Sequence, residues 1–122
     1  MTVQEIIDIC LSYHGAYIDY PFGEIPICIK VCNHIFAQVY PKASDCKITL
    51  KCDAMYGDFY RTKYKNTVVR GYHCTPIQQP YWNTIYLNGI VDDNELKQMI
   101  EHAYVVVVNK LTKKEKLELK HS

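Results

Sequence analysis

The sequence lacks long apolar runs and a basic leader, and each absence excludes a class of protein. The longest uninterrupted apolar stretch runs from Ala103 to Val108, far short of the ~20 residues that a membrane-spanning helix needs. Residues 1–26 contain no Lys or Arg, and the early apolar residues are interrupted by Gln4, Glu5 and Asp8. This pattern is unlike a secretory signal peptide. We therefore expect a cytoplasmic protein with no membrane partner.

Signatures of catalysis and of metal binding are also missing. The chain contains no glycine-rich phosphate loop, nucleophile elbow or HExxH helix. His73 and Cys74 are adjacent, so on an extended strand they would point to opposite faces and could not act as a pair. Cys28 and Cys32 would lie about 13 Å apart on a strand, too far to share a zinc ion. We predict a non-enzymatic protein with no catalytic residue, metal or cofactor.

The composition that remains is that of one globular domain. The chain has 122 residues, of which 48% are apolar and 22% charged, values typical of a folded domain of ordinary size. Six cysteines and eleven tyrosines stand out. In a cytoplasmic protein the cysteines are expected to be reduced and to pack as small apolar residues. The tyrosines suit either half-buried strand positions or a binding face.

The net charge of +1 conceals an uneven distribution. Residues 41–75 carry seven basic and three acidic side chains, a net charge of +4, whereas residues 1–26 carry −4. The chain is therefore not a polycation, yet its middle is modestly basic. This pattern is compatible with a small phosphate-binding surface but limits the extent of that surface.

Apolar periodicity predicts a helix, three strands, a short helix, two strands and a long helix. The first helix follows Thr2 and stops at Gly15, residues 17–26 are a loop, and Asp53 and Asp92 cap the later helices. The predicted strands span residues 27–32, 35–40, 46–52, 67–73 and 82–88. This order predicts an α+β two-layer sandwich, in which an antiparallel β-meander of about five strands is packed by the N- and C-terminal helices. Residues 1–112 form a single domain, and residues 113–122 a basic helix end or tail.

Side-chain alternation assigns faces to these elements. A three-residue loop at 33–35 keeps the first hairpin's apolar residues on one face by pairing Ile29 with Val39. In the third strand the apolar residues face the core, whereas Lys47, Thr49 and Lys51 face solvent. The buried side of the short helix is predicted to carry Met55, Phe59 and Tyr60. The inner face of the last helix comprises Leu96, Met99, Ile100, Ala103, Tyr104, Val107 and Leu111.

Several short blocks resemble the signature of the MmcQ/YjbR family. They are Tyr20-Pro21-Phe22-Gly23, Leu50-Lys51-Cys52-Asp53, Gly71-Tyr72-His73, Trp82-Asn83-Thr84 and the tail Lys110-Leu111-Thr112-Lys113-Lys114. The resemblance extends from about residue 2 to residue 118. It implies a CyaY-like, frataxin-like sandwich and the DNA-binding label that family members carry. It also implies a signature surface or groove formed by Tyr20, Phe22, Tyr72, His73, Trp82 and Asn83.

The resemblance makes DNA the first predicted partner. Sequence-independent contacts to phosphate would come from Lys47, Lys51, Arg61, Lys63, Lys65 and Arg70. The segment from Cys74 to Tyr81 carries no charge, so the basic residues that the resemblance implies there, and any phosphate contacts they would make, are missing. The alternative interpretation is that strand lysines keep the sheet soluble and protect its edges.

A second hypothesis is a small protein- or ligand-interaction module that uses the open face of the sheet. Its aromatic candidates are Tyr40, Tyr72, Tyr81, Trp82 and Tyr86, because aromatic residues are enriched at interfaces. His73 and Trp82 either line a groove or lock the fold. In both hypotheses the protein is expected to be a monomer.

Overall fold

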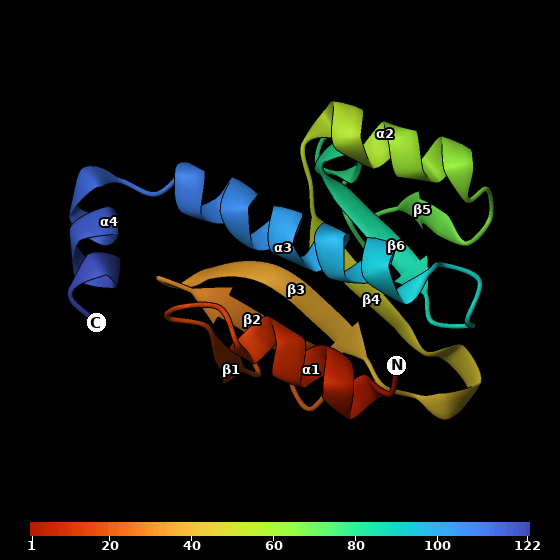
Figure 1. Ribbon diagram of the computed structural model, residues 1–122, viewed down its shortest axis with the longest axis horizontal. Helices are drawn as coiled ribbons and strands as arrows, with labels where there is room; N and C mark the ends of the chain where they lie inside the picture. Colours follow the sequence, from red (N-terminus) through yellow and green to blue (C-terminus); the bar gives the residue numbers. More distant parts are fainter.

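The computed structural model describes residues 1–122 and contains one antiparallel sheet with four α-helices (Figure 1). The helices are α1 (Val3–Leu11), α2 (Ala54–Lys63), α3 (Asp93–Asn109) and α4 (Lys113–Lys120). The strands are β1 (Tyr17–Asp19), β2 (Ile27–Val31), β3 (His34–Tyr40), β4 (Lys47–Lys51), β5 (Val68–Arg70) and β6 (Trp82–Tyr86). Two 3-10 turns, η1 (Ala43–Asp45) and η2 (Gln79–Tyr81), precede β4 and β6. The predicted α+β fold is confirmed. No helix has both the length and the apolar composition needed to cross a membrane.

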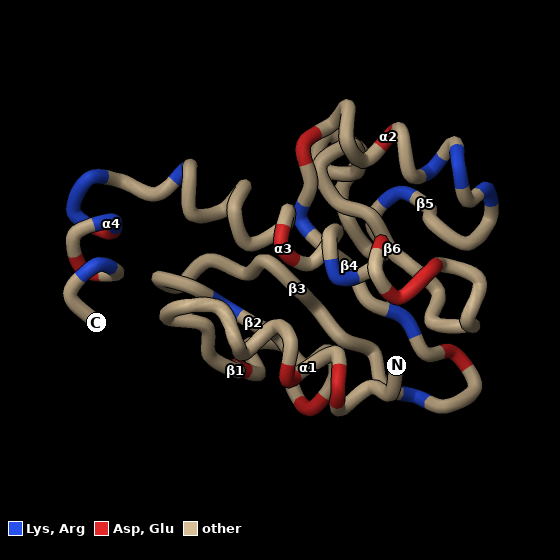
Figure 2. Tube along the Cα trace, in the orientation of Figure 1, with Lys and Arg blue, Asp and Glu red and all other residues tan.

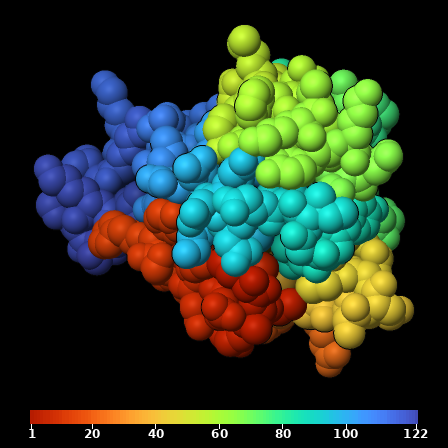
Figure 3. Space-filling view, turned by 45° about the vertical axis from the view of Figure 1, so that its right-hand side comes forward, coloured from red at the N-terminus to blue at the C-terminus, as the bar shows by residue number.

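The six strands form one layer and three helices cover one of its faces. The strand order is β1-β2-β3-β4-β6-β5, so β6 lies between β4 and β5 and the last two strands depart from sequential order. Helices α1 and α3 pack on the middle strands, and α2 packs on β5 and β6 (Figure 1). Seen from the surface, these three helices lie together on one side of the molecule (Figure 3). The predicted inner face is confirmed, since all seven of its residues are buried, six of them in α3 and Leu111 just beyond its end. The opposite face of the sheet carries no helix and is covered only by loops.

Side-chain caps begin the helices where the sequence predicts them. Thr2 and Glu5 form a reciprocal capping box at α1, and Asp53 and Asp92 accept the first free N–H groups of α2 and α3. These bonds satisfy donors that would otherwise have no partner. Helix α1 ends at Leu11, one turn earlier than the predicted stop.

The C-terminal segment forms a helix of its own. Thr112 and Glu115 make a second capping box, which starts α4 in a new direction after α3 ends (Figure 1). Leu119 of α4 packs against the core. Residues 113–120 are therefore an ordered, docked helix rather than a fraying end of α3.

The predicted register of the first hairpin is wrong. Cys32 and Asn33 adopt positive φ angles of 47° and 66°, the backbone of a two-residue turn that matches the twist of the strands. Ile29 pairs with Ala37 instead of with the residue two positions further along. A β-bulge at Phe36 absorbs one extra residue and so returns the apolar residues to the core face, which a regular two-residue hairpin could not do.

Residues 17–19 form a strand, so the predicted loop over residues 17–26 is wrong at its start. This strand, β1, pairs antiparallel with β2 at the edge of the sheet. Its Asp19 carboxylate accepts a hydrogen bond from Lys30 Nζ at 2.7 Å. The segment is too short for an alternating pattern to be visible, which explains why it was missed.

The buried side of α2 also differs from the prediction. Met55 and Phe59 are 83% and 58% exposed, whereas Tyr60 is buried as predicted. The helix is rotated so that Gly57 faces the sheet, where an added Cβ would lie 2.7 Å from Cys52 Sγ. This close approach explains a glycine in the middle of a helix.

A histidine beneath α2 makes stability dependent on pH. His102 Nε2 accepts a hydrogen bond from the Asp53 N–H at 3.0 Å, and its ring stacks on Tyr56 with centroids 3.6 Å apart. Burial lowers the pKa of His102, although Asp53 opposes the shift. The unfolded chain therefore takes up this proton first as the pH falls below about 6.5, and the folded state loses stability from there downward.

We expect His102→Gln to reduce this pH dependence, because glutamine can accept the same bond without titrating. The contribution of one proton cannot exceed about 1.4 kcal/mol per pH unit. Chemical denaturation at pH 7.5 and pH 5 gives the loss in the free energy of unfolding for each protein. The contribution of His102 is the loss in the native protein minus the loss in the variant. If both proteins lose the same free energy of unfolding between pH 7.5 and pH 5, His102 is not the source of the pH dependence.

Candidate functional site

A pocket of about 580 Å³ opens on the face of the sheet that has no helix. Its floor is the adjacent ends of β3 and β4, and its walls are the loop before β2 and the turn after β5. Eleven residues line it: Phe22, Ile25, Pro26, Gln38, Tyr40, Lys42, Asp45, Lys47, Tyr72, His73 and Cys74. The volume lies within the range of small-molecule sites.

Lys47 lies at the centre of the pocket floor. The residue is only 4% exposed, so the prediction that it faces solvent is wrong. Its ammonium group pairs with Asp45 and lies 4.1 Å from the ring centre of Tyr72, with Tyr40 and Tyr86 at 5.4 and 6.0 Å. A cation surrounded by aromatic rings is stabilised by their quadrupoles even where water is excluded.

Thr49, the next outward residue of β4, is also buried rather than solvent-facing. Its hydroxyl shares a 2.8 Å hydrogen bond with Thr84 of β6, and Thr84 Oγ1 accepts the Tyr72 N–H at 2.7 Å. Lys51, the third predicted outward residue, is half-buried. The turn after β5 thus closes over the strand face that alternation alone assigns to solvent.

Close packing shapes this turn. A Cβ on Gly71 would lie 2.6 Å from Cys74 Sγ and 2.7 Å from Trp82 Cβ, which is shorter than any ordinary contact. His73 follows with a φ of 60°, a conformation that costs energy for a residue with a side chain. The turn therefore holds His73 at the rim of the pocket in a strained backbone geometry.

His73 and Cys74 line the same pocket, so the expectation that they point to opposite faces is wrong. Strand β5 ends at Arg70, and the two residues lie in a turn where strand alternation does not apply. Burial raises the pKa of the Cys74 thiol, although the charge of Lys51 opposes this shift. The thiol is therefore protonated at neutral pH and is a weak nucleophile.

The six signature residues separate into three places. Phe22, Tyr72 and His73 line the pocket, and Tyr20 is exposed on the loop beside it. Asn83 is buried on the helical side of the sheet, and Trp82 lines a different recess near the end of α3. The signature thus combines site residues with residues that hold the fold.

Four of the pocket residues, namely Ile25, Pro26, Gln38 and Asp45, are not predicted as site residues from the sequence. They have no shared motif and come from three separate segments. The register of β3 with β4 sets Tyr40 opposite Lys47. This pairing is the signal that could have located the pocket on the sheet.

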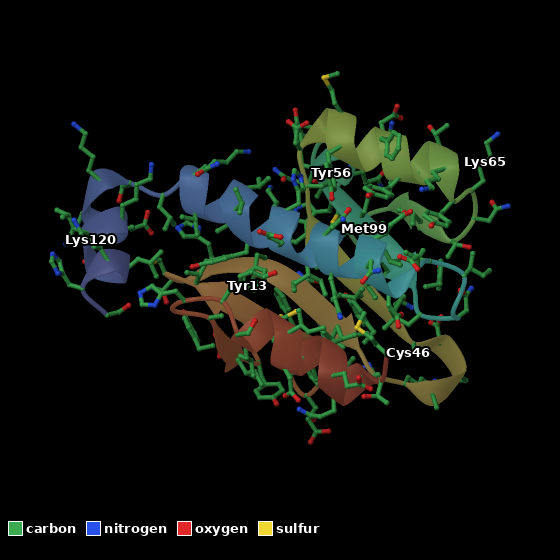
Figure 4. The ribbon with its side chains drawn as sticks, viewed as in Figure 1. Tyr13, Cys46, Tyr56, Lys65, Met99 and Lys120 are labelled. Carbon is green, nitrogen blue, oxygen red and sulfur yellow. The ribbon has the colours of Figure 1, made fainter.

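The six predicted phosphate-binding residues occupy different environments. Lys47 is buried beside Asp45, Lys63 is paired with Glu95 at 2.6 Å, and Arg61 Nη1 donates to Asn83 Oδ1 at 2.6 Å. Lys51 is half-buried, whereas Lys65 and Arg70 are exposed. Basic residues gather at the end of α2 and on α4, where Lys65 and Lys120 mark opposite ends of the long axis (Figures 2 and 4).

The six cysteines are all free thiols. Burial raises the pKa of Cys10 to about 12 and that of Cys52 to about 11. Both side chains are shielded from water, as is that of Cys28. No group of three or more His, Cys, Asp or Glu side chains is arranged to hold a metal ion.

A model of the YjbR family matches residues 11–106. The chain belongs to the YjbR family. The uncharacterised protein YjbR of Escherichia coli, from strain K12 and likewise from O157:H7, is 24% identical over 111 residues, which is 91% of each chain. The signature blocks identified in the sequence therefore point to the correct family.

Solved structures of similar chains share the fold of this YjbR-family protein. A crystal structure from Deinococcus radiodurans has a TM-score of 0.87 at 24% identity and covers 98% of this chain and 88% of its own. A crystal structure from Pseudomonas syringae has a TM-score of 0.69 at 20% identity, covering 87% and 98% respectively. The relation to frataxin-like proteins stays a prediction, since none of these relatives tests it.

Proposed function

We propose that this YjbR-family protein is a non-enzymatic binding module whose site is the pocket on the open face of the sheet. One observation carries the proposal: a cavity of about 580 Å³ gathers Phe22, Tyr72 and His73 of the signature around one buried cation. Concave sites with apolar walls and few convergent polar groups are the usual form of ligand sites.

The lining indicates the kind of ligand. Phe22 and Ile25 are 64% and 50% exposed, so they offer apolar surface that a ligand would remove from water. Lys47 and Gln38 supply hydrogen-bond donors at the floor. These features suit a small organic molecule that has an apolar body and one hydrogen-bond-accepting or anionic group.

A fragment screen by ligand-observed NMR tests this proposal. We expect fragments of this chemistry to bind, and Phe22→Ala to weaken their binding about tenfold because apolar contact area is lost. His73→Gly removes the imidazole while relieving its backbone strain, so the variant should stay folded. Met55→Ala is the matched control, because Met55 is also an exposed apolar residue but lies on α2, outside the pocket. If Phe22→Ala and His73→Gly bind every fragment as the native protein does, the pocket is not the site.

Sequence-nonspecific DNA binding is the second candidate function. It is favoured by Lys65 and Arg70, which are exposed side chains near the edge of the sheet that form no ion pair. Three to five phosphate contacts predict that the logarithm of the binding constant falls with log salt at a slope of about −3 to −4.5. Anisotropy of a labelled duplex measures this slope. Lys65→Gln should lower its magnitude by about one, and absence of binding at ~50 mM salt would exclude DNA.

A further inference from the structure

A second recess lies where β4 ends, β3 begins and the last turn of α3 passes over them. Its volume is about 370 Å³. It is lined by Asn33, His34, Ile35, Lys51, Trp82, Val107, Lys110 and Leu111. One wall is apolar and the rest is polar, and no lining residue is shared with the pocket described above.

Lys51 is the unusual residue of this recess. Four basic residues of the protein are buried or partly buried, and three of them have an aspartate partner: Lys30 with Asp19, Lys47 with Asp45, and Arg61 with Asp58. Lys51 is the fourth and forms no ion pair. A cation that is partly buried without a carboxylate is costly unless another anion reaches it.

A second ammonium group lies near the first. Lys51 Nζ is 5.9 Å from the ring centre of Tyr81, and Lys110 Nζ is 5.8 Å from the same ring. Burial lowers the pKa of Lys51, and the charge of Lys110 lowers it further. The two lysines therefore repel each other across an open recess.

The carboxylate that contacts His34 of this recess is already engaged. Glu115 of α4 binds His34 Nε2 at 2.8 Å and accepts the Thr112 N–H at 3.0 Å in its capping box. It forms no ion pair with Lys51 or Lys110. The recess thus presents two lysines that have no carboxylate partner, beside a histidine that Glu115 already binds.

We infer that this recess binds the phosphate group of a small organic phosphate, with Lys51 and Lys110 as the cations that hold it. A phosphate dianion matches two convergent ammonium groups in charge, and lysine is a common phosphate ligand. The apolar wall of Ile35, Val107 and Leu111, beside Trp82, accommodates the organic part of the ligand. This site is independent of the pocket on the open face and goes beyond its proposed function.

Trp82 makes the inference directly testable, because it is the only tryptophan of the chain and lines the recess. Its fluorescence is titrated with inorganic phosphate, with phenyl phosphate and with chloride at matched ionic strength. We expect a saturable change with both phosphates, and tighter binding of phenyl phosphate because its ring adds apolar contact. A response to phosphate that equals the response to chloride would overturn the inference.

Three variants test which lysine side chains contribute to phosphate binding. Lys110→Gln and Lys51→Gln should each weaken phosphate binding about tenfold or more, since each removes a charge-assisted contact. Lys97→Gln makes the same charge change at an exposed position near the other end of α3 and should bind as the native protein does. Lys110 is exposed, so its variant remains folded even if Lys51→Gln does not. If Lys97→Gln and Lys110→Gln lose the same phosphate affinity, the effect comes from net charge alone. That result would contradict a specific site in the recess.

Discussion

Asn83→Ala is expected to lower the free energy of unfolding by about 3 kcal/mol, which corresponds to a fall in melting temperature of about 10 °C. Asn83 is buried, accepts a hydrogen bond from Arg61 Nη1 at 2.6 Å and donates to the Gly57 carbonyl at 3.1 Å. Alanine leaves the Arg61 guanidinium with only its 3.9 Å contact to the exposed Asp58, and removes the side-chain donor to the Gly57 carbonyl, in a place that water does not easily reach. The loss therefore exceeds that of an ordinary hydrogen bond.

Two comparison variants make the result specific. Asn94→Ala removes the same side chain from the exposed first turn of α3 and should change stability by no more than about 0.5 kcal/mol. Asn83→Asp keeps the acceptor for Arg61 and loses the donor, so it should lie between alanine and the native protein. Urea denaturation measures all three. A loss for Asn83→Ala as small as that for Asn94→Ala would show that Asn83 does not join α2 to the sheet.

Local signals of the sequence were sufficient wherever one segment determines the structure by itself. The caps at Thr2, Asp53 and Asp92 begin helices as predicted, because a side-chain acceptor and the N–H groups it satisfies are neighbours in sequence. The inner face of α3 follows from its period alone. The family signature was equally visible, since its blocks are contiguous.

Features that depend on two segments could not be predicted in this way. The hairpin bulge at Phe36 reconciles a two-residue turn with an apolar face, and alternation cannot show where an extra residue is inserted. Lys47 obeys alternation and lies on the outer face, yet it is buried because the turn after β5 closes over it. The position of that turn depends on Gly71 packing against Trp82 Cβ, a contact that no local pattern encodes.

The candidate site shows the same division. Phe22, Tyr72 and His73 were singled out from the signature, but the pocket that unites them needs Asp45 and Lys47 from a different hairpin. Arg61 and Lys63 belong to the basic middle of the sequence, yet both have partners within the fold. Net charge counts residues, whereas a binding surface depends on which of them remain unpaired.

Lys47→Ala is expected to cost about 3 kcal/mol of stability. The substitution removes a cation from among the rings of Tyr40, Tyr72 and Tyr86, which contributes about 2 kcal/mol where water is excluded. It also removes the aliphatic stem that fills the pocket floor. The exposed Lys42→Ala at the rim of the same pocket is the control, with an expected change of at most about 0.5 kcal/mol.

Lys47→Met separates the role of the charge from that of the stem. Methionine keeps the apolar length under the rings, and the released Asp45 carboxylate, whose side chain is 53% exposed, regains water at little cost. Replacing a buried ion pair by a packed apolar side chain is often nearly neutral, so we expect a stability loss of about 1 kcal/mol or less. Binding should respond differently, because an anionic fragment loses its only buried cation and with it about tenfold in affinity. If the methionine variant is as unstable as alanine and Asp45→Asn reproduces the loss, then Lys47 serves the fold through its ion pair rather than the ligand.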